Sequence, residues 1–473
     1  MTMASETIFE APATRQRLAI VFLSTYVVML MAAGGGQIVD PFVHYDDYPA
    51  LVLYPEGYYM KTLAEGRWLN YWWHLRGVFT PPWFNFQLYV IGWALFSAAA
   101  SLSIFRTSDI RYPGLLAALL VLAPQTTLIS GWFNTLIPGV WLMAAYAATT
   151  LFVSARTGSL LLLVFVPLAL QTYSSYPFML LAICMMREDQ EKSLTTLVGL
   201  MALFTLSFGL GILVIYSLNF AVHEIFGVAL AGWRDPEPAS DLTGLIHNLS
   251  KTVASLTQLY SMTGFGKPAL SAMIATAFLA SLVAICRKRP IEVLFILVPA
   301  IAGLGLLCLH SAAEGIIFPF RSTYFVWLTV AISVVRAVQL REPGNGSAPF
   351  ALTLMFTLTV GAMVRVHNQG LSIWQHETRL IAAQIPATAR EIFIHGTHLA
   401  INGPSGPLTQ SPGDFQYRVT YLTSIWAEMC TEDPESCEGV TPPFEPPVSG
   451  DPLLILQNDE SVFIRLPITE IES

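Results

Sequence analysis

The sequence carries very little charge. Asp, Glu, Lys and Arg make up 12% of its 473 residues, about half the share that is usual in a soluble globular protein. Hydrophobic residues make up 54%, and the mean hydropathy is +0.57. The net charge of -8 offers no basic excess for binding nucleic acid, which we do not expect as a partner. The composition excludes an ordinary soluble domain and indicates an integral membrane protein, which has the lipid bilayer as a partner.

Motifs of soluble enzymes are also missing. The chain contains no GxSxG, Walker loop, HExxH, CxxCH or dinucleotide fingerprint in a suitable context. Hydrolases, kinases and redox enzymes of the soluble type therefore have no support. Aromatic residues are plentiful, with 28 Phe, 17 Tyr and 11 Trp, as membrane-interface belts and carbohydrate-binding clefts both require.

Cysteine is scarce, with five residues in the whole chain. Three of them lie inside apolar runs, where they are expected to be inert packing residues. Cys430 and Cys437 instead bracket the acidic loop CTEDPESC in the polar tail. A disulfide between them is predicted if the tail lies in an oxidising compartment.

Apolar runs of about 20 residues predict membrane-spanning helices. They cover 18–36, 83–103, 113–128, 136–154, 194–217, 268–286, 291–309, 324–340 and 349–366. The run 159–186 is interrupted by the polar patch QTYSSYP at 171–177 and is predicted to form two short helices that meet there. The fold class is therefore an all-α polytopic membrane protein with about 11 transmembrane helices.

The basic residues predict the orientation. With two helices in 159–186, the clusters of Arg and Lys fall on one face, which the positive-inside rule assigns to the cytoplasm. The N-terminus is then cytoplasmic and the C-terminal tail lies outside. We predict a transmembrane domain at 1–369 and an extracytoplasmic domain of mixed α/β structure at 370–473. The first outer loop, 37–82, is expected to form short helices along the interface, and GWRDPEPASD at 232–241 a solvated turn.

The first outer loop holds the main candidates for chemistry. His44, Asp46 and Asp47 follow the first span directly, with Glu56 and Arg67 shortly after. The two aspartates could be turn or cap residues, a general base with its orienting partner, or weak candidates for binding a divalent cation such as Mg or Mn. The spacing of these residues matches no strong metal motif, so the sequence predicts no definite cofactor.

A late outer segment adds His310, Glu314 and Arg321. An arginine on the outer face runs against the inside bias for basic residues, and its guanidinium can bind a lipid-linked phosphate with two hydrogen bonds. A histidine in the position of His310 is more often an interfacial residue with its hydrogen bonds satisfied than an acid or a ligand. The patch QTYSSYP contributes an amide and several hydroxyls, or is simply a loop between short spans.

These features together resemble the GT-C superfamily of membrane glycosyltransferases, most closely the GtrII-type glucosyltransferases that modify bacterial surface polysaccharides. The likeness rests on DD at 46–47, GRW at 66–68, the interrupted helix with Gln and Tyr at 171–176, and Arg321. It covers roughly the first 340 residues. A DxD spacing is absent and the tail has no counterpart in the pattern, so metal use and the acceptor stay open.

The resemblance implies an inverting glycosyltransferase in the bacterial inner membrane. Its partners would be a polyprenyl-phosphate sugar donor and a hydroxyl of a cell-envelope glycan or lipid acceptor. Asp46 or Asp47 would be the catalytic base, and Arg321, assisted by Arg67 or His310, would bind the donor phosphate. The residues expected to bind substrate are His44, Glu56, Tyr58, Trp72, Trp73, Gln171, Tyr173, Tyr176 and Glu314.

The main alternative is a transporter or flippase of a lipid-linked saccharide. That class predicts a pseudo-symmetric repeat and polar residues in the middle of several helices. Here the ionisable residues cluster in the external loops, which favours the enzyme. A polysaccharide ligase or a scaffold that presents the tail are further alternatives with less support.

Overall fold

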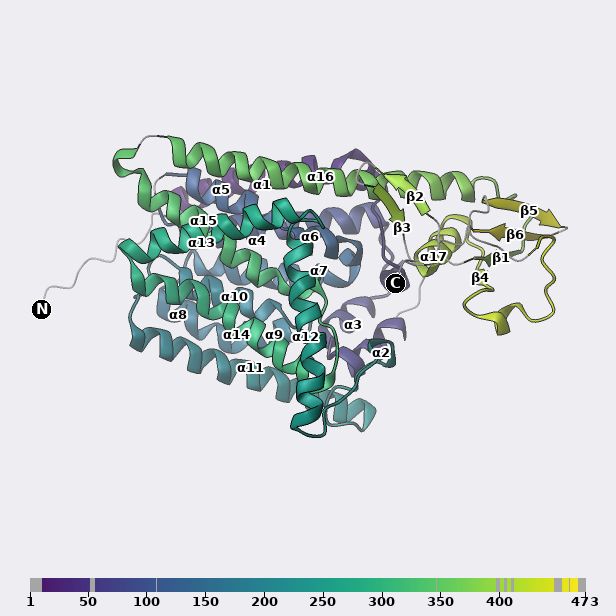
Figure 1. Ribbon diagram of the computed structural model, residues 1–473, viewed down its shortest axis with the longest axis horizontal. Coiled ribbons are helices and arrows are strands. Elements are labelled where there is room, and N and C mark those ends of the chain that lie inside the picture. The colour runs from purple at the N-terminus through teal and green to yellow at the C-terminus, as the bar shows by residue number, and fades with distance from the viewer. Residues whose placement is uncertain are drawn as a thin grey trace, which may run out of the picture.

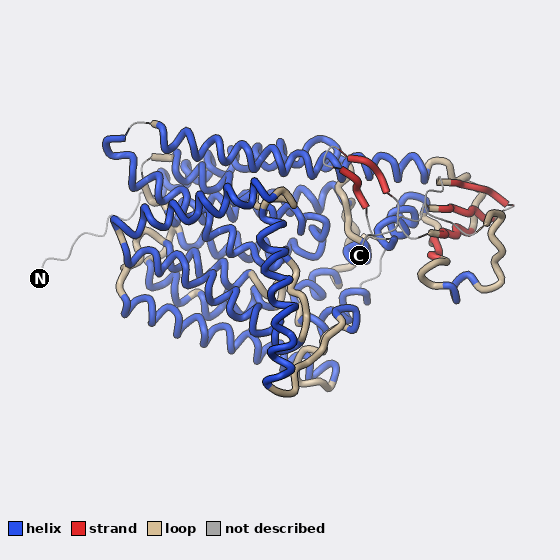
Figure 2. The backbone as a smooth tube through the Cα atoms, viewed as in Figure 1, coloured by secondary structure: helices blue, strands red, loops and turns tan. Residues whose placement is uncertain are grey.

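A bundle of long helices makes up most of the molecule, with a small sheet at one end (Figures 1 and 2). The computed structural model describes residues 11–51, 56–107, 109–345, 347–396, 400–403, 406–409, 412–445, 453–458 and 460–466. Within these ranges, eight helices are long and apolar enough to cross a membrane. The structure is that of a multi-pass membrane protein.

The long helices start where the sequence supplies a suitable first turn. They are α1 (Ala11–Val39), α4 (Pro82–Ile104), α7 (Phe133–Thr150), α11 (Leu194–His223), α13 (Pro268–Lys288), α14 (Pro290–Glu314), α15 (Tyr324–Asn345) and α16 (Ala348–Ala382). Proline, whose missing N–H costs nothing in a first turn, opens α4, α13 and α14. Ser193 caps α11 by accepting the Thr196 N–H at 3.2 Å.

One predicted span falls across two helices. The run 113–128 is divided between α5 (Arg111–Val121) and α6 (Pro124–Ile129). Since each residue of a helix rises about 1.5 Å, α5 is too short to cross a bilayer. After Pro124 the chain continues through α6 and η2 (Ser130–Trp132) into α7, and Pro124–Thr150 forms one apolar stretch long enough to span.

The interrupted run 159–186 breaks where the sequence predicted. It forms α8 (Ala155–Leu160), α9 (Leu162–Leu170) and α10 (Tyr176–Met186), and residues 171–175 are not helical. The turn is fixed to the first loop, since the Asn70 side chain donates to the Thr172 carbonyl oxygen at 3.0 Å.

Short helices gather at the end of the bundle that carries the sheet (Figure 1). They are η1 (Tyr45–Ala50), α2 (Glu56–Glu65), α3 (Trp68–His74), η3 (Gly232–Arg234) and η4 (Phe320–Thr323). The longer helix α12 (Leu242–Thr263) packs against η4. Helix α12 crosses the long helices and exposes an apolar stripe that includes Leu245, Leu249 and Val253. An amphipathic helix in this position suits the surface of a membrane.

The tail begins later than predicted. The expected boundary at 369 falls inside α16, which runs on to Ala382. Beyond it lie β1 (Glu391–His395), β2 (Ala400–Gly403), β3 (Gly406–Thr409), α17 (Pro412–Thr423), β4 (Ala427–Met429), η5 (Pro434–Cys437), β5 (Leu454–Asn458) and β6 (Ser461–Arg465). The order of the main sheet is β4-β1-β6-β5, with β1 parallel to β4 and β6, and β5 antiparallel to β6.

The two faces of the sheet follow the alternation of the strands. Ile392 and Ile394 point to the face that packs on α17 and on Trp374 of α16. Phe393 lies on the other face, in a cluster with Phe463 and the two cysteines of the tail. The sheet is thereby attached to the far end of α16.

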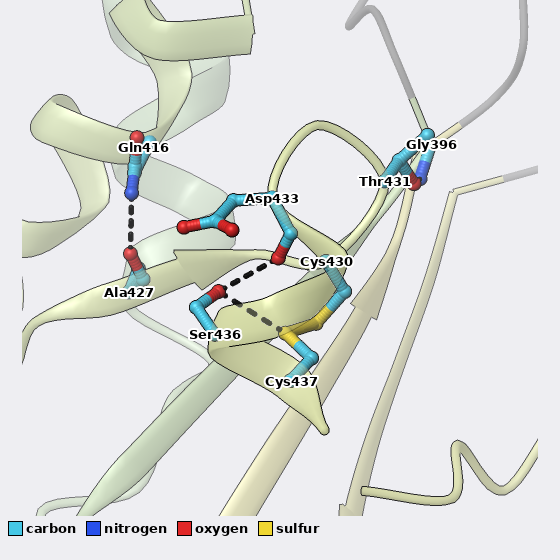
Figure 3. The surroundings of a disulfide bond; sticks show 8 residues. All are labelled: Gly396, Gln416, Ala427, Cys430, Thr431, Asp433, Ser436 and Cys437. Carbon is cyan, nitrogen blue, oxygen red and sulfur yellow. Dashed lines mark hydrogen bonds between the residues drawn. A yellow bond between two sulfur atoms is a disulfide. The ribbon is translucent and has the colours of Figure 1, made fainter.

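A disulfide closes the loop after β4 (Figure 3). Cys430 and Cys437 are bonded, with a Cα–Cα distance of 5.4 Å. The Ser436 hydroxyl donates to the Asp433 carbonyl oxygen at 2.8 Å within the same loop. The Gly396 N–H after β1 donates to the Thr431 hydroxyl at 2.8 Å, so the closed loop is also tied to the sheet.

Candidate functional site

Two adjoining cavities open at the end of the bundle that faces the tail. The first, the loop-lined cavity, has a volume of about 630 Å³ and is walled by η1, α2, η2 and residues 229–231. The second, the helix-lined cavity, has a volume of about 700 Å³ and lies among α10, α11, α14 and α15. Arg67, Tyr173 and Arg321 line both cavities and mark their junction.

A tight turn between α2 and α3 positions part of that junction. Gly66 has a φ of 69°, in the left-handed region that favours glycine. A Cβ at this position would also approach the Ile215 side chain to 2.6 Å. The turn lets Glu65 and Arg67 meet in an ion pair of 2.7 Å (Nε to Oε2).

Asp46 sits in the wall of the loop-lined cavity with two partners. Its Oδ1 lies 2.7 Å from His44 Nδ1, and its Oδ2 lies 3.3 Å from Lys61 Nζ. Burial alone would raise the pKa of Asp46, but the hydrogen bond from His44 and the ammonium of Lys61 outweigh it. The pKa is thus held well below its usual range and the carboxylate stays ionised.

Asp47 points the other way, into the protein, and is fully buried. Its carboxylate accepts the Asn134 and Thr135 backbone N–H groups at 2.9 and 2.8 Å, and the side chains of both residues also donate to it. Burial raises the pKa of Asp47, and these donors oppose the rise. Asp47 therefore ties η1 to the first turn of α7 and does not line either cavity.

Glu65 neutralises the arginines on one side of the junction. Besides Arg67, it pairs with Arg234 at 3.1 Å. Burial would raise the pKa of Glu65, but Arg67, Lys61 and Arg234 together lower it. The predicted solvated turn at 232–241 is thus corrected, because its Arg234 lines the helix-lined cavity.

Arg321 has a different environment. Its guanidinium carbon lies 4.5 Å from the centre of the Trp132 ring, and the His44 ring stacks on Trp132 with a centroid distance of 4.0 Å. Among the described residues, no carboxylate forms an ion pair with Arg321. A positive charge at a cavity junction, supported by an aromatic ring but not neutralised, is suited to binding an anion.

The helix-lined cavity is mainly apolar away from the junction. Phe208, Ile212 and Tyr216 of α11 line it together with Leu306 and Leu307 of α14. His310 and Glu314, one turn apart on α14, line the same cavity. The combination of an apolar wall with charged groups at one end suits an amphipathic ligand.

The predicted site residues fall into two groups. The residues that line the cavities are His44, Asp46, Arg67, Tyr173, His310, Glu314 and Arg321. The residues that line neither are Asp47, Tyr58, Trp72, Trp73, Gln171 and Tyr176. Glu56 was also predicted to bind substrate, and its side chain lies outside the described residues.

Several residues of the second group have identifiable structural roles. The Tyr58 hydroxyl donates to the Asp47 carbonyl oxygen at 3.0 Å and its ring stacks on His74. The backbone carbonyl of Gln171 accepts the Leu69 N–H at 3.2 Å. The contacts of Tyr58 hold η1, α2 and α3 of the first loop together, and the contact of Gln171 fixes α3 to the bundle.

The sequence analysis missed the charged lining residues Lys61, Glu65 and Arg234, and it missed Trp132, on which Arg321 lies. Lys61 and Glu65 are four residues apart in a helix, which places them on one face, so the helical spacing in MKTLAEG could have found them. Trp132 and Arg234 come from distant loops, and no local signal places them here.

The aspartates do not form a metal site. The oxygens of Asp46 are engaged by His44 and Lys61, whereas Asp47 faces away. No group of three or more His, Cys, Asp or Glu side chains converges in the described ranges. The residues present do not fit a divalent cation, because an ammonium occupies the position next to the cavity carboxylate.

No protein-family model matches this chain, and no curated protein matches it significantly. The geometry of the two cavities is therefore the guide to function.

Proposed function

We propose that this protein is an inverting glycosyltransferase that moves a sugar from a polyprenyl-phosphate donor to a hydroxyl of a cell-envelope glycan or lipid. The observation that carries the proposal is the position of Arg321. It lies at the junction of an apolar cavity and a polar one, and no described carboxylate neutralises it.

The helix-lined cavity suits the donor. Its apolar side between α11 and α14 is lined by Phe208, Ile212 and Leu306, which can pack against a polyprenyl chain. The phosphate would then lie at the junction, within reach of Arg321 and Arg67. Such a donor would lie in the outer leaflet, with the tail domain in the periplasm of a bacterial inner membrane.

The loop-lined cavity suits the sugar and the acceptor. Transfer requires a group that accepts the proton of the acceptor hydroxyl, and the pair formed by His44 and Asp46 lies in this wall. As the bond from the anomeric carbon to the phosphate oxygen breaks, negative charge develops on the phosphate. Arg321 and Arg67 would stabilise that charge.

A donor panel tests this function. Purified wild-type protein in detergent is expected to transfer sugar from at least one synthetic polyprenyl-phosphate sugar. Arg321→Ala should lower kcat/KM by roughly 10²–10³, because one fixed donor to the developing charge is lost. Arg321→Lys, which keeps the charge without the planar fork, should be affected less.

The matched control is Arg287→Ala. Arg287 lies in the last turn of α13, is exposed and lines neither cavity. Its substitution should leave transfer unchanged. Correctly folded wild-type protein that transfers sugar from none of the donors, but carries a lipid-linked saccharide across vesicle membranes, would replace the proposal with the transporter.

A further inference from the structure

The contact between His44 and Asp46 defines which ring nitrogen carries the hydrogen. Nδ1 lies 2.7 Å from Asp46 Oδ1, and an ionised carboxylate offers only lone pairs. The hydrogen of this contact therefore belongs to Nδ1. In the neutral ring, the lone pair is then on Nε2, which has no hydrogen-bond partner among the described residues.

The imidazole of His44 is held on several sides. Its ring stacks on Trp132 at 4.0 Å with an interplanar angle of 25°. Its backbone N–H donates to the Gly131 carbonyl oxygen at 2.9 Å. Glycine suits position 131, because a Cβ there would come within 3.2 Å of the Phe42 ring. His44 is thus preorganised in the wall of the loop-lined cavity.

Asp46 is the poorer base of the two. Its oxygens already accept from His44 and from the Lys61 ammonium, and both contacts favour the ionised form. A carboxylate that is stabilised in this way has little tendency to take a further proton. The same carboxylate is well placed to stabilise a positive charge on the imidazole.

We infer that His44, through Nε2, is the catalytic base of the transfer and that Asp46 is its positioning residue. This inference rests on the proposed function. The acceptor oxygen forms a bond to the anomeric carbon while its proton passes to His44 Nε2. The bond from the anomeric carbon to the phosphate oxygen breaks, and its electron pair leaves with the polyprenyl phosphate.

Other charged groups surround His44 and Asp46 but are less suited to act as the base. Those that line the same cavity, besides Asp46, are Lys61 and Glu65 of α2, Arg67 at the start of α3, and Arg321 of η4. From the tail, Asp414 accepts the neighbouring Tyr45 N–H at 2.6 Å. The side chains of Lys61, Arg67 and Arg321 only donate hydrogen bonds, and Glu65 is paired with Arg67 and Arg234, so none of the four is a ready proton acceptor.

The test compares kcat and KM in four variants, using a synthetic polyprenyl-phosphate sugar that the wild type accepts. His44→Ala and His44→Gln should lower kcat by roughly 10²–10⁴ with little change in the KM for donor, as expected for loss of a general base. Asp46→Asn should also lower kcat, because the amide no longer fixes the useful tautomer. The matched control His247→Ala, whose side chain is 77% exposed, should behave as wild type.

Chemical rescue separates a catalytic role from a structural one. Free imidazole should restore part of the activity of His44→Ala, where it can fill the missing position, but should not restore Arg321→Ala. Thermal unfolding in detergent checks that each variant is folded, and His44→Gln keeps the test valid if the alanine variant is not.

Two results would overturn the inference. Full kcat in folded His44→Gln, with loss of transfer in Asp46→Asn, would make Asp46 the base. A raised KM for donor with unchanged kcat in the His44 variants would make His44 a binding residue. Neither result would affect the proposed function, whereas a folded wild type that transfers sugar from no donor would remove both.

Discussion

Asp47→Ala is expected to destabilise the protein strongly. The fully buried carboxylate accepts two backbone N–H groups and two side chains from Asn134 and Thr135. Alanine would leave these buried donors without partners, at about 1–3 kcal/mol for each group. We expect a loss of at least about 3 kcal/mol, seen as a lower midpoint of thermal unfolding in detergent.

The neighbouring carboxylate is the natural control. The side chain of Asp46 is 31% exposed, and its partner Lys61 is also partly exposed. Asp46→Ala should therefore change stability by no more than about 1 kcal/mol, although it should impair transfer. The assignment of the two residues would be reversed if Asp47→Ala were as stable as wild type and inactive while Asp46→Ala stayed active.

This pair shows what the sequence could and could not predict about the site. The sequence singled out residues 46 and 47, because two carboxylates beside a membrane span are costly. It could not tell them apart. The difference depends on Asn134, 87 residues away, and on a short helix that turns adjacent side chains in different directions.

The fold was predictable to the extent that hydropathy defines it. Most long helices match apolar runs, because each must bury its backbone polar groups and present apolar side chains to lipid. The prediction of one membrane span at 113–128 was wrong, because hydropathy does not register the helix break before Pro124. The predicted domain boundary at 369 came too early for a related reason. Helix α16 continues to Ala382 after its membrane-like stretch ends.

The tail domain also contacts the first outer loop, which carries Asp46 and Asp47. Arg418 of α17, 2% exposed, pairs with Asp40 at 2.9 and 2.5 Å. Asp414 accepts the Tyr45 N–H, and the Tyr417 ring stacks on Tyr48 at 5.8 Å. Helix α17 therefore contacts η1 directly and fixes the chain just before it.

Arg418→Ala is expected to loosen this attachment. The substitution removes a buried partner of Asp40, although Arg379 still pairs with that carboxylate and Asp40 is 19% exposed. We therefore expect a loss of about 2–3 kcal/mol, less than for a fully buried pair. Chymotrypsin should then cut within α17, after Tyr417 or Tyr421, sooner than in wild type.

The rate of sugar transfer should also fall in Arg418→Ala, because the loosened attachment holds η1, which carries Asp46 and is preceded by His44. A displacement of about 1 Å in such a group can cost as much as 10²-fold in rate, so we expect a decrease of between roughly 10- and 100-fold. The control is Arg390→Ala, which removes an exposed ion pair with Glu460 and should change neither readout. If the tail is cut faster but transfer is unchanged, the tail does not position the site, and η1 is held by Asp47 and α7 alone.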